Sequence, residues 1–382
     1  MAKHLRLALL PAVVWGCDLP AARGEQARAA AQPAPAYRCA ASIAPDQAAA
    51  GAEIRSSYAD WKRRYVTPRG AGGLLRVTMA EKGGDRTSSE AIGYGMLLAA
   101  YLDDRPTFDA LWAYAKRHRN PRGLMAWNVS PQGRVLDPNA ATDGDIDMAF
   151  ALVVADARWK AYGADARALI RSLRTHAIES GTYVLKPGDV WGGSNVMNPS
   201  YFAPAYFRVF AAYTGDASWN RVIDANYAIL ARVSARHSRG TGLQPELTTI
   251  GGDSSTAQGN FEFHYGYNAT RIPWRLAKDA AWNCDPRARG HLDQLNAFFR
   301  RVGASAIRDG YTLQGHPNER WHTAAFVGPA MAGAIVAPDA RFRAQMWNET
   351  LRLRGEGYYH DSLRLLSLLF ASGNMPPPPT RR

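Results

Sequence analysis

The chain has 382 residues, of which 47% are hydrophobic and 10% aromatic, so it can bury the core of one large domain or of two ordinary ones. Its formal charge is +13, from 46 basic and 33 acidic residues. The basic residues form no block of the kind that binds nucleic acid, and a basic surface disfavours a cationic substrate.

The N-terminus has the layout of an export signal. Residues 1–29 start with basic side chains, continue with an apolar run at residues 7–15 and end among alanines. The apolar run is too short to span a bilayer. Cys17, which follows Gly16, is a candidate lipid-attachment site. We therefore expect a secreted or periplasmic protein without a membrane span, with a lipoprotein as the alternative.

The hydrophobic pattern of residues 51–372 has the period of α-helices, which predicts one all-α domain. A linker is expected at residues 30–50 and a disordered tail at residues 373–382. The expected helices lie near residues 52–65, 90–102, 107–119, 145–161, 165–179, 200–213, 217–236, 268–281, 290–302, 321–335, 340–351 and 358–371.

Three connections between these helices are long and rich in Gly, Pro, Trp and Asp, at residues 120–144, 180–199 and 239–267. Long structured loops in a compact domain usually carry function. We expect them to gather at one end of a helical barrel and to line a cleft.

Glu90 is the one carboxylate in the stretch SSEAIGYGM at residues 88–96. Ser88 and Ser89 are good N-cap residues, which places Glu90 in the first turn of a helix. An acid with few polar neighbours tends to stay protonated, the form that can protonate a leaving oxygen. Glu90 is therefore a candidate general acid, and the alternative is an acid placed there for the helix dipole.

Three acids are crowded into the stretch ATDGDIDMAFALVVADARW at residues 141–159. The apolar spacing predicts a helix that begins near Asp145, with Asp143 at or just before its cap. Asp143, Asp145 and Asp147 cannot all be capping residues. A calcium loop is a weak alternative, because the series of ligands ends at Met148.

Aromatic residues lie in or beside the three long loops, interleaved with Asp, Asn and Arg. Sugar rings stack on aromatic faces while their hydroxyls need polar partners, so this composition is typical of a sugar-binding groove. Some of these residues are expected to be ordinary core residues. The set is Trp127, Trp191, Tyr201, Tyr206, Tyr265, Tyr267 and Trp274.

No cysteine has the spacing of a zinc site. Cys39 and Cys284 could pair in an oxidising compartment, but two cysteines define no disulfide framework.

With these motifs in their observed order, the sequence resembles glycoside hydrolase family eight. The signature at residues 141–159, the acid motif at residues 88–96, NPSYFAPA at residues 198–205 and YNATRIPWR at residues 267–275 carry the resemblance. It implies an (α/α)6 barrel of about twelve helices that cleaves β-1,4-linked polysaccharide with inversion and uses no metal or organic cofactor.

Residue by residue, the resemblance implies that Glu90 donates the proton and that Asp143 binds and distorts the sugar at the cleavage point. The residues that would contact the sugar or order the attacking water are Trp127, Trp191, Tyr201, Asn268 and Arg271.

Asn268 departs from the family pattern, because many members have the catalytic Asp at this position. An amide cannot accept a proton from water at neutral pH. The loop before it offers Glu246, Asp253 and Glu262. Glu262 lies between two phenylalanines just ahead of Asn268, so it is the preferred general base, with Asp253 next. Glu246 resembles a structural or subsite position of the family.

We therefore expect a monomeric, exported endo-glucanase of the cellulase type, with a β-linked polysaccharide as its partner. A chitosanase or lichenase of the same family is the nearest alternative. A glycan-binding protein that has lost its catalytic base is the alternative from another class.

Overall fold

The computed structural model describes residues 36–80, 84–255 and 263–379. Residues 34–382 form one compact unit. The expected export signal at residues 1–29 and the preferred general base Glu262 both lie outside the described residues.

The described residues contain twelve α-helices, one for each helix expected from the sequence. Most boundaries agree within four residues; α1 begins five residues earlier than expected. The helices are α1 (Gln47–Tyr65), α2 (Ser89–Tyr101), α3 (Arg105–Arg117), α4 (Thr142–Trp159), α5 (Gly163–His176), α6 (Pro204–Thr214), α7 (Ser218–Arg236), α8 (Ile272–Asn283), α9 (Pro286–Val302), α10 (Ala324–Gly333), α11 (Ala340–Arg352) and α12 (Tyr358–Ala371).

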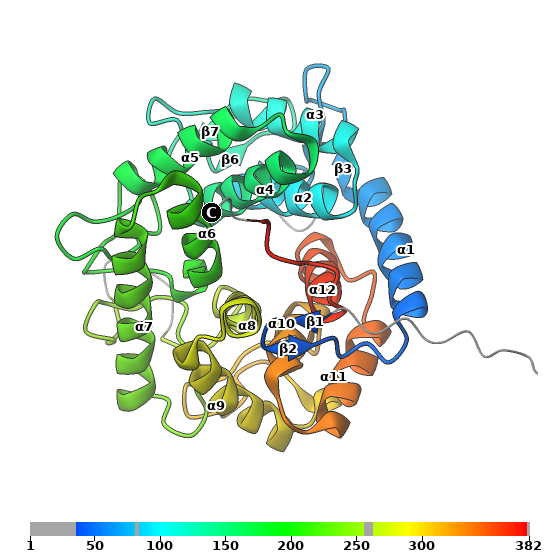
Figure 1. Cartoon of the computed structure of the whole chain (residues 1–382), viewed down its shortest axis with the longest axis vertical. Helices are drawn as coiled ribbons and strands as arrows, with labels where there is room; N and C mark the ends of the chain where they lie inside the picture. The colour runs from blue at the N-terminus through cyan, green and yellow to red at the C-terminus, as the bar shows by residue number, and fades with distance from the viewer. Residues whose placement is uncertain (1–35, 81–83, 256–262, 380–382) are drawn as a thin grey trace, which may run out of the picture. The chain divides into compact units, whose positions relative to one another are not determined.

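These helices form two concentric rings, an (α/α)6 barrel. The even-numbered helices contact one another in chain order from α2 to α12, and α12 closes the ring on α2. The odd-numbered helices lie around them on the outside (Figure 1). The predicted all-α barrel is confirmed.

The sequence explains why the rings alternate. Every residue of α10 is buried, and in α2 all residues except Glu90 and Tyr101 are buried, as expected for helices that are apolar all round. The outer helix α9 instead buries a single stripe that includes Leu292, Leu295 and Phe299. Such a stripe packs on the inner ring while the opposite face remains in water.

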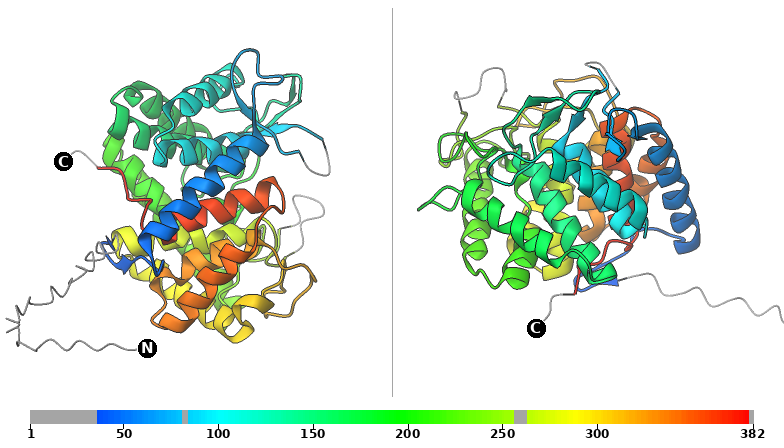
Figure 2. Two further views of the ribbon diagram at one scale, coloured as in Figure 1. Left: turned by 90° about the vertical axis from the view of Figure 1, so that its right-hand side faces the viewer. Right: turned by 90° about the horizontal axis from the view of Figure 1, so that it is seen from above.

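The inner helices begin at the same end of the barrel. Arg271, directly before α8, hydrogen bonds to Glu90 in the first turn of α2 and to Asp143 in the first turn of α4. It also binds Ser200 ahead of α6, and Tyr358 in the first turn of α12 contacts Glu90. The long loops therefore meet over the N-terminal ends of the inner helices. Figure 2 shows the blue-to-cyan loop after α1 and the orange loop before α10 extending to the same side.

Short strands brace these loops. The antiparallel sheet β5–β6–β7 pairs Thr87 with Val129, and Asn128 with both Ser88 and Asp137. It fixes the entry into α2 against the loop that carries Trp127. The strands are β1 (Ala36–Tyr37), β2 (Ala40–Ala41), β3 (Val66–Thr67), β4 (Arg76–Val77), β5 (Thr87–Ser88), β6 (Asn128–Val129) and β7 (Val135–Asp137). The short 3₁₀ helices are η1 (Pro199–Tyr201), η2 (Ala269–Arg271), η3 (Ala304–Ala306) and η4 (Ala334–Val336).

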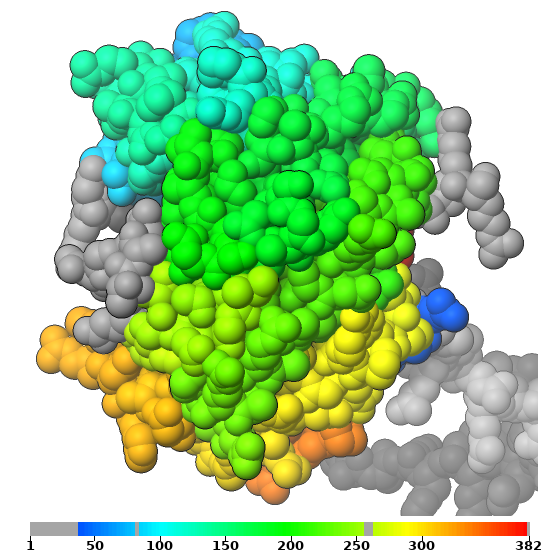
Figure 3. Space-filling model, turned by 90° about the vertical axis from the view of Figure 1, so that its left-hand side faces the viewer, coloured from blue at the N-terminus to red at the C-terminus, as the bar shows by residue number. Residues whose placement is uncertain are grey.

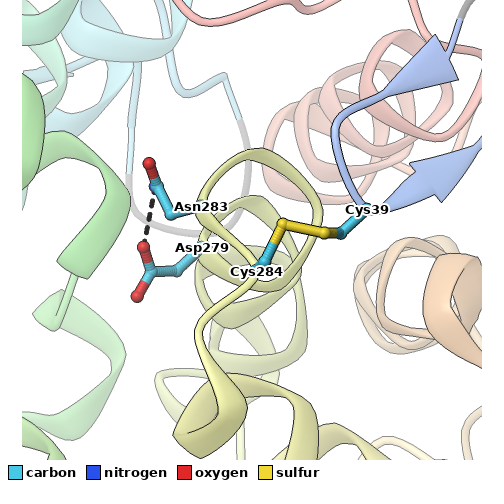
Figure 4. The surroundings of a disulfide bond; sticks show 4 residues. All are labelled: Cys39, Asp279, Asn283 and Cys284. Carbon is cyan, nitrogen blue, oxygen red and sulfur yellow. Dashed lines mark hydrogen bonds between the residues drawn. A yellow bond between two sulfur atoms is a disulfide. The ribbon is translucent and has the colours of Figure 1, made fainter.

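Both ends of the described unit are tied to the barrel, unlike the linker and disordered tail expected from their composition. Cys39, in the turn between β1 and β2, forms a disulfide with Cys284 at the end of α8 (Figure 4). Met375 is fully buried, and its backbone N–H donates to the hydroxyl of Tyr37. The tail through residue 379 is therefore part of the folded unit, because an apolar side chain anchors it.

Candidate active site

Glu90 lies at the inner rim of the loop end. Its helix is capped by Ser88, whose hydroxyl accepts a hydrogen bond from the backbone N–H of Ala91 at 3.1 Å. The Glu90 side chain is 18% exposed, so it is largely removed from water but still reachable from the loop side. Burial raises the pKa of Glu90 to about 7, Arg271 opposes this shift, and Asp143 adds to it. The carboxyl group can therefore hold a proton near neutral pH.

Arg271 connects the groups that the sequence singled out. Its Nη1 atom lies 2.7 Å from Oε2 of Glu90 and 2.6 Å from Oδ2 of Asp143. Its Nη2 atom donates to Ser200 Oγ at 2.8 Å and to Asn268 Oδ1 at 3.1 Å. The guanidinium also lies over the ring of Tyr201, 5.2 Å from the ring centroid. One buried cation thus fixes two carboxylates, a hydroxyl, an amide and an aromatic ring.

Asp143 is inside the first turn of α4, which begins at Thr142 and not near Asp145 as the sequence suggested. The residue before the helix, Ala141, makes no side-chain cap, so none of the three acids is the N-cap residue. The apolar spacing located the helix correctly but could not show that its polar first turn is also helical.

Gly144 explains how Asp143 reaches Glu90. A Cβ atom at Gly144 would lie 2.5 Å from the carbonyl carbon of Ser89 and 2.7 Å from the backbone nitrogen of Glu90. Only glycine allows α4 and α2 to approach this closely. The two carboxylates can therefore share one Arg271 nitrogen.

The other two acids of the cluster serve the framework. Asp147 forms an ion pair with Arg275, with Oδ2 and Nη2 2.8 Å apart. Asp145 accepts a hydrogen bond from the backbone N–H of Met125 at 3.0 Å, and burial raises its pKa well above the usual range. Asp145 therefore ties α4 to the loop that carries Trp127.

Asn268 lies at the turn into η2, where its side-chain oxygen accepts from Arg271. Its backbone N–H donates to Oε1 of Glu246 at 2.9 Å, and Glu246 is 8% exposed. Among the candidate bases, Glu246 thus contacts the turn that carries Asn268.

Asp253 lies elsewhere on the loop. Its carboxylate accepts from Arg236 at 2.6 Å and from His237 at 3.2 Å, both at the C-terminal end of α7. The Asp253 side chain is 52% exposed. A carboxylate held between two such donors is a poor proton acceptor, and hydrogen bonds from His237 and Arg236 lower its pKa.

The aromatic residues separate into two groups. Trp127, Trp191 and Tyr201 are half-buried and Tyr267 is exposed, so each of these residues keeps part of its surface in contact with solvent. Tyr206, Tyr265 and Trp274 are buried core residues, and the ring of Tyr206 stacks on Phe150 at 3.6 Å between centroids. The sequence could not separate the groups because both flank the same loops.

Three further residues of the site were missed. Ser200 binds Arg271, Tyr358 donates to Glu90 Oε1 at 3.3 Å, and Tyr359 donates to the carbonyl oxygen of Tyr267 at 2.6 Å. Ser200 lies within the motif at residues 198–205, which was a usable signal. Tyr358 and Tyr359 start an apolar helix far along the chain, and nothing local linked them to Glu90.

Within the ranges that the structure describes, no helix is both long and apolar enough to cross a membrane.

Comparison with known proteins places this site in a family. Residues 33–373 match the model of glycosyl hydrolases family 8. Endoglucanase A of Acetivibrio thermocellus is 43% identical over 349 residues, which cover 88% of this chain and 72% of the relative. Endoglucanase 2 of Ruminiclostridium josui is 39% identical over 358 residues, covering 91% of this chain and 76% of the relative.

A solved structure, a beta-1,3-1,4-glucanase from Paenibacillus sp. X4, superposes with a TM-score of 0.83 at 28% identity. The match covers 90% of this chain and 99% of that one. The matched family model spans the barrel, the cluster around Arg271 and all of the loops between them. This chain therefore belongs to glycosyl hydrolases family 8.

Proposed function

We propose that this protein is an inverting endo-glucanase that hydrolyses β-1,4 bonds within a glucan chain. The observation that carries the proposal is the pairing of Glu90 and Asp143 on one nitrogen of Arg271. Burial raises the pKa of Glu90 to about 7, as a general acid at neutral pH requires. The endoglucanase relatives, at 39% and 43% identity, support a β-1,4-glucan as the substrate.

In the proposed reaction Glu90 gives its proton to the glycosidic oxygen as the bond from that oxygen to the anomeric carbon breaks. Water attacks the same carbon from the opposite face and loses a proton to a carboxylate. The new hydroxyl therefore has the inverted configuration. Inversion requires the two carboxyl groups to be about 6.5–9.5 Å apart, because the water lies between them. Asp143, held by Arg271, binds the sugar at the cleavage point.

The general base is Glu262 in this proposal, with Glu246 as the alternative. The setting of Glu262 in the sequence supports it, between Phe261 and Phe263 and just before Asn268. The hydrogen bond from Asn268 to Glu246 supports the alternative. Asn268 itself is assigned to holding Arg271 and a sugar hydroxyl, because its amide cannot take a proton from water.

A lichenase is the second candidate function, favoured by Asn268 and by the likeness to the beta-1,3-1,4-glucanase. A reducing-sugar assay on carboxymethyl cellulose, lichenan, xylan and chitosan separates the candidates. Activity on carboxymethyl cellulose with products of inverted configuration in NMR is the expected result. Activity on lichenan alone would favour the second candidate. Binding without hydrolysis of any of the four would overturn the enzyme assignment.

Export from the cytoplasm is part of the proposal. It is supported by the apolar run at residues 7–15 after a basic start, and by the Cys39–Cys284 disulfide, since disulfides persist in oxidising compartments. N-terminal sequencing of the native protein should find a start beyond about residue 20, as expected for a cleaved signal. An intact Met1 would contradict it.

A further inference from the structure

Trp321 is the most exposed large hydrophobic side chain in the described part of the chain, at 55% exposure. It lies in the segment between η3 and α10, which stands out in orange at one edge of the face in Figure 3. A tryptophan left in water forgoes the stabilisation that burial would give, so an exposed one at the loop end of a barrel needs an explanation.

The backbone around Trp321 is fixed. Its carbonyl oxygen accepts from the backbone N–H of Asp309 at 3.0 Å. The next residue, His322, is held at both ring nitrogens, by the carbonyl of Ile307 and by Glu349, each at 2.7 Å. The indole is thus carried on a backbone segment that hydrogen bonds hold in place, which limits the conformational entropy that binding would cost.

A chain of hydrogen bonds connects this segment to the site. The carboxylate of Asp309 accepts from the hydroxyl of Tyr267 at 2.9 Å and from the backbone N–H of Thr323 at 2.9 Å. Tyr267 is 40% exposed and directly precedes Asn268, which binds Arg271. Trp321 and Tyr267 are therefore two exposed aromatic residues that are linked through Asp309, and Tyr267 adjoins the residue that binds Arg271.

Arg320 completes the arrangement. Its guanidinium lies 4.7 Å from the centroid of the Trp321 ring and is exposed, so hydrogen-bond donors stand next to the apolar surface. An aromatic face with adjacent donors matches a pyranose ring, which has apolar faces and equatorial hydroxyls.

We propose that Trp321, with Arg320, forms a distal subsite that binds the glucan chain beyond the sugars at the cleavage point. The inference rests on the proposed function, because the ligand is the same β-1,4-glucan. Such a subsite adds binding energy for a long chain in the ground state and in the transition state alike. It therefore lowers KM for polymer without changing kcat.

The test compares kcat/KM on carboxymethyl cellulose with kcat/KM on cellotetraose for the wild type, Trp321→Ala and Trp321→Phe. In Trp321→Ala the polymer-to-oligosaccharide ratio should fall roughly fivefold to tenfold, through a higher KM. Trp321→Phe keeps an aromatic face and should retain most of the ratio.

Trp159→Ala is the matched control. Trp159 is a half-buried tryptophan whose indole donates to an exposed aspartate, Asp103, and it lies at the end of α4 away from Asp143. Sixteen residues of helix separate it from Asp143, about 24 Å. Its replacement should leave the ratio unchanged.

An unchanged ratio in Trp321→Ala, with active enzyme, would overturn the subsite. A ratio that falls equally in Trp159→Ala would also overturn it, because the effect would then be one of stability. Wild-type protein inactive on both substrates would instead contradict the proposed function, so the two failures are distinguishable.

Discussion

The Nη1 atom of Arg271 lies 2.7 Å from Oε2 of Glu90, so the proposed acid is in direct contact with a cation. Such a contact on its own favours the ionised carboxylate. Burial acts in the opposite direction and is the larger effect, and together they leave the pKa of Glu90 at about 7. The acid is thereby poised between its two protonation states near neutral pH.

Glu90→Gln tests the role of the acid. The amide keeps the shape of the side chain but cannot donate the proton, and general acid help is worth roughly 10²–10⁴-fold. We expect kcat on carboxymethyl cellulose to fall by that factor while the affinity for cello-oligosaccharides, measured by calorimetry, changes little. Near-normal turnover on the polymer would exclude Glu90 as the acid.

The pH dependence of kcat/KM should follow the protonation of Glu90. Only the protonated form donates, so activity should decline as pH rises through about 7. Arg271 lowers this pKa, and Arg271→Gln should therefore move the alkaline limb to higher pH. Thermal unfolding of the variant serves as the control for folding. A limb that stays in place in a folded variant would show that another group controls it.

The same pKa makes a prediction about stability. The pKa of Glu90 is raised from 4.5 in the unfolded chain to about 7, so the folded protein holds the extra proton more tightly. This contribution is fully present below pH 4.5 and is lost as pH rises through about 7. The Glu90→Gln variant lacks this contribution, because glutamine does not bind the proton.

Urea unfolding of both proteins at pH 5 and pH 8 measures the difference. The free energy of unfolding of Glu90→Gln, relative to the wild type, should be higher at pH 8 than at pH 5, by on the order of 1–3 kcal/mol. An equal difference at both pH values would mean that Glu90 titrates normally in the folded protein.

The framework of the site was readable from the sequence for a physical reason. Apolar residues at helical spacing mark all twelve helices, because the inner helices are buried on most sides and the outer helices bury one apolar stripe. The motifs around Glu90 and Asp143 are continuous stretches of sequence, so they could identify functional residues in the first turn of a helix.

The sequence could not predict which distant segments contact one another. Glu90 meets Arg271 across 181 positions and Tyr358 across 268 positions, and no local pattern encodes either pair. The pairing of Cys39 with Cys284, across 245 positions, stayed open for the same reason. The exposed Trp321 carried no signal either, because its link to the site runs through Asp309 to Tyr267, which lies far away in the sequence.

The disulfide should matter for stability and not for catalysis. Cys284 lies at the end of α8 that is remote from Arg271. Thirteen residues separate them, which is about 20 Å along the helix axis. Loss of a native disulfide typically costs about 2–5 kcal/mol in small secreted domains. Cys39→Ser/Cys284→Ser should lower Tm but leave kcat at 25 °C within about twofold of the wild type, as expected for a change that removes only a stability contribution.

Reductant provides the control for that experiment. It should lower the Tm of the wild type toward that of the double variant and leave the double variant unchanged. If reductant has no effect on the wild-type Tm, the two cysteines are not paired in the protein as isolated.

The identity of the general base is decided by chemical rescue. Truncating the base of an inverting enzyme leaves room for azide to attack the anomeric carbon in place of water, and azide needs no proton acceptor. We therefore expect Glu262→Ala to lose hydrolysis and to regain cleavage with azide, giving a glycosyl azide of inverted configuration. NMR of the product identifies both its structure and its configuration.

Glu246→Ala and Asp253→Ala are the matched comparisons, since each removes one carboxylate from the same loop. Asp253 is bound by Arg236 and His237, so its replacement should leave kcat near the wild-type value. Glu246 holds the backbone of Asn268, and through it one partner of Arg271, so its replacement should lower activity without azide rescue. Rescue of Glu246→Ala together with normal hydrolysis by Glu262→Ala would move the base to Glu246. The hydrogen bond from Asn268 would then orient the carboxylate of Glu246 toward the water, and Glu262 would have no part in the proton transfer.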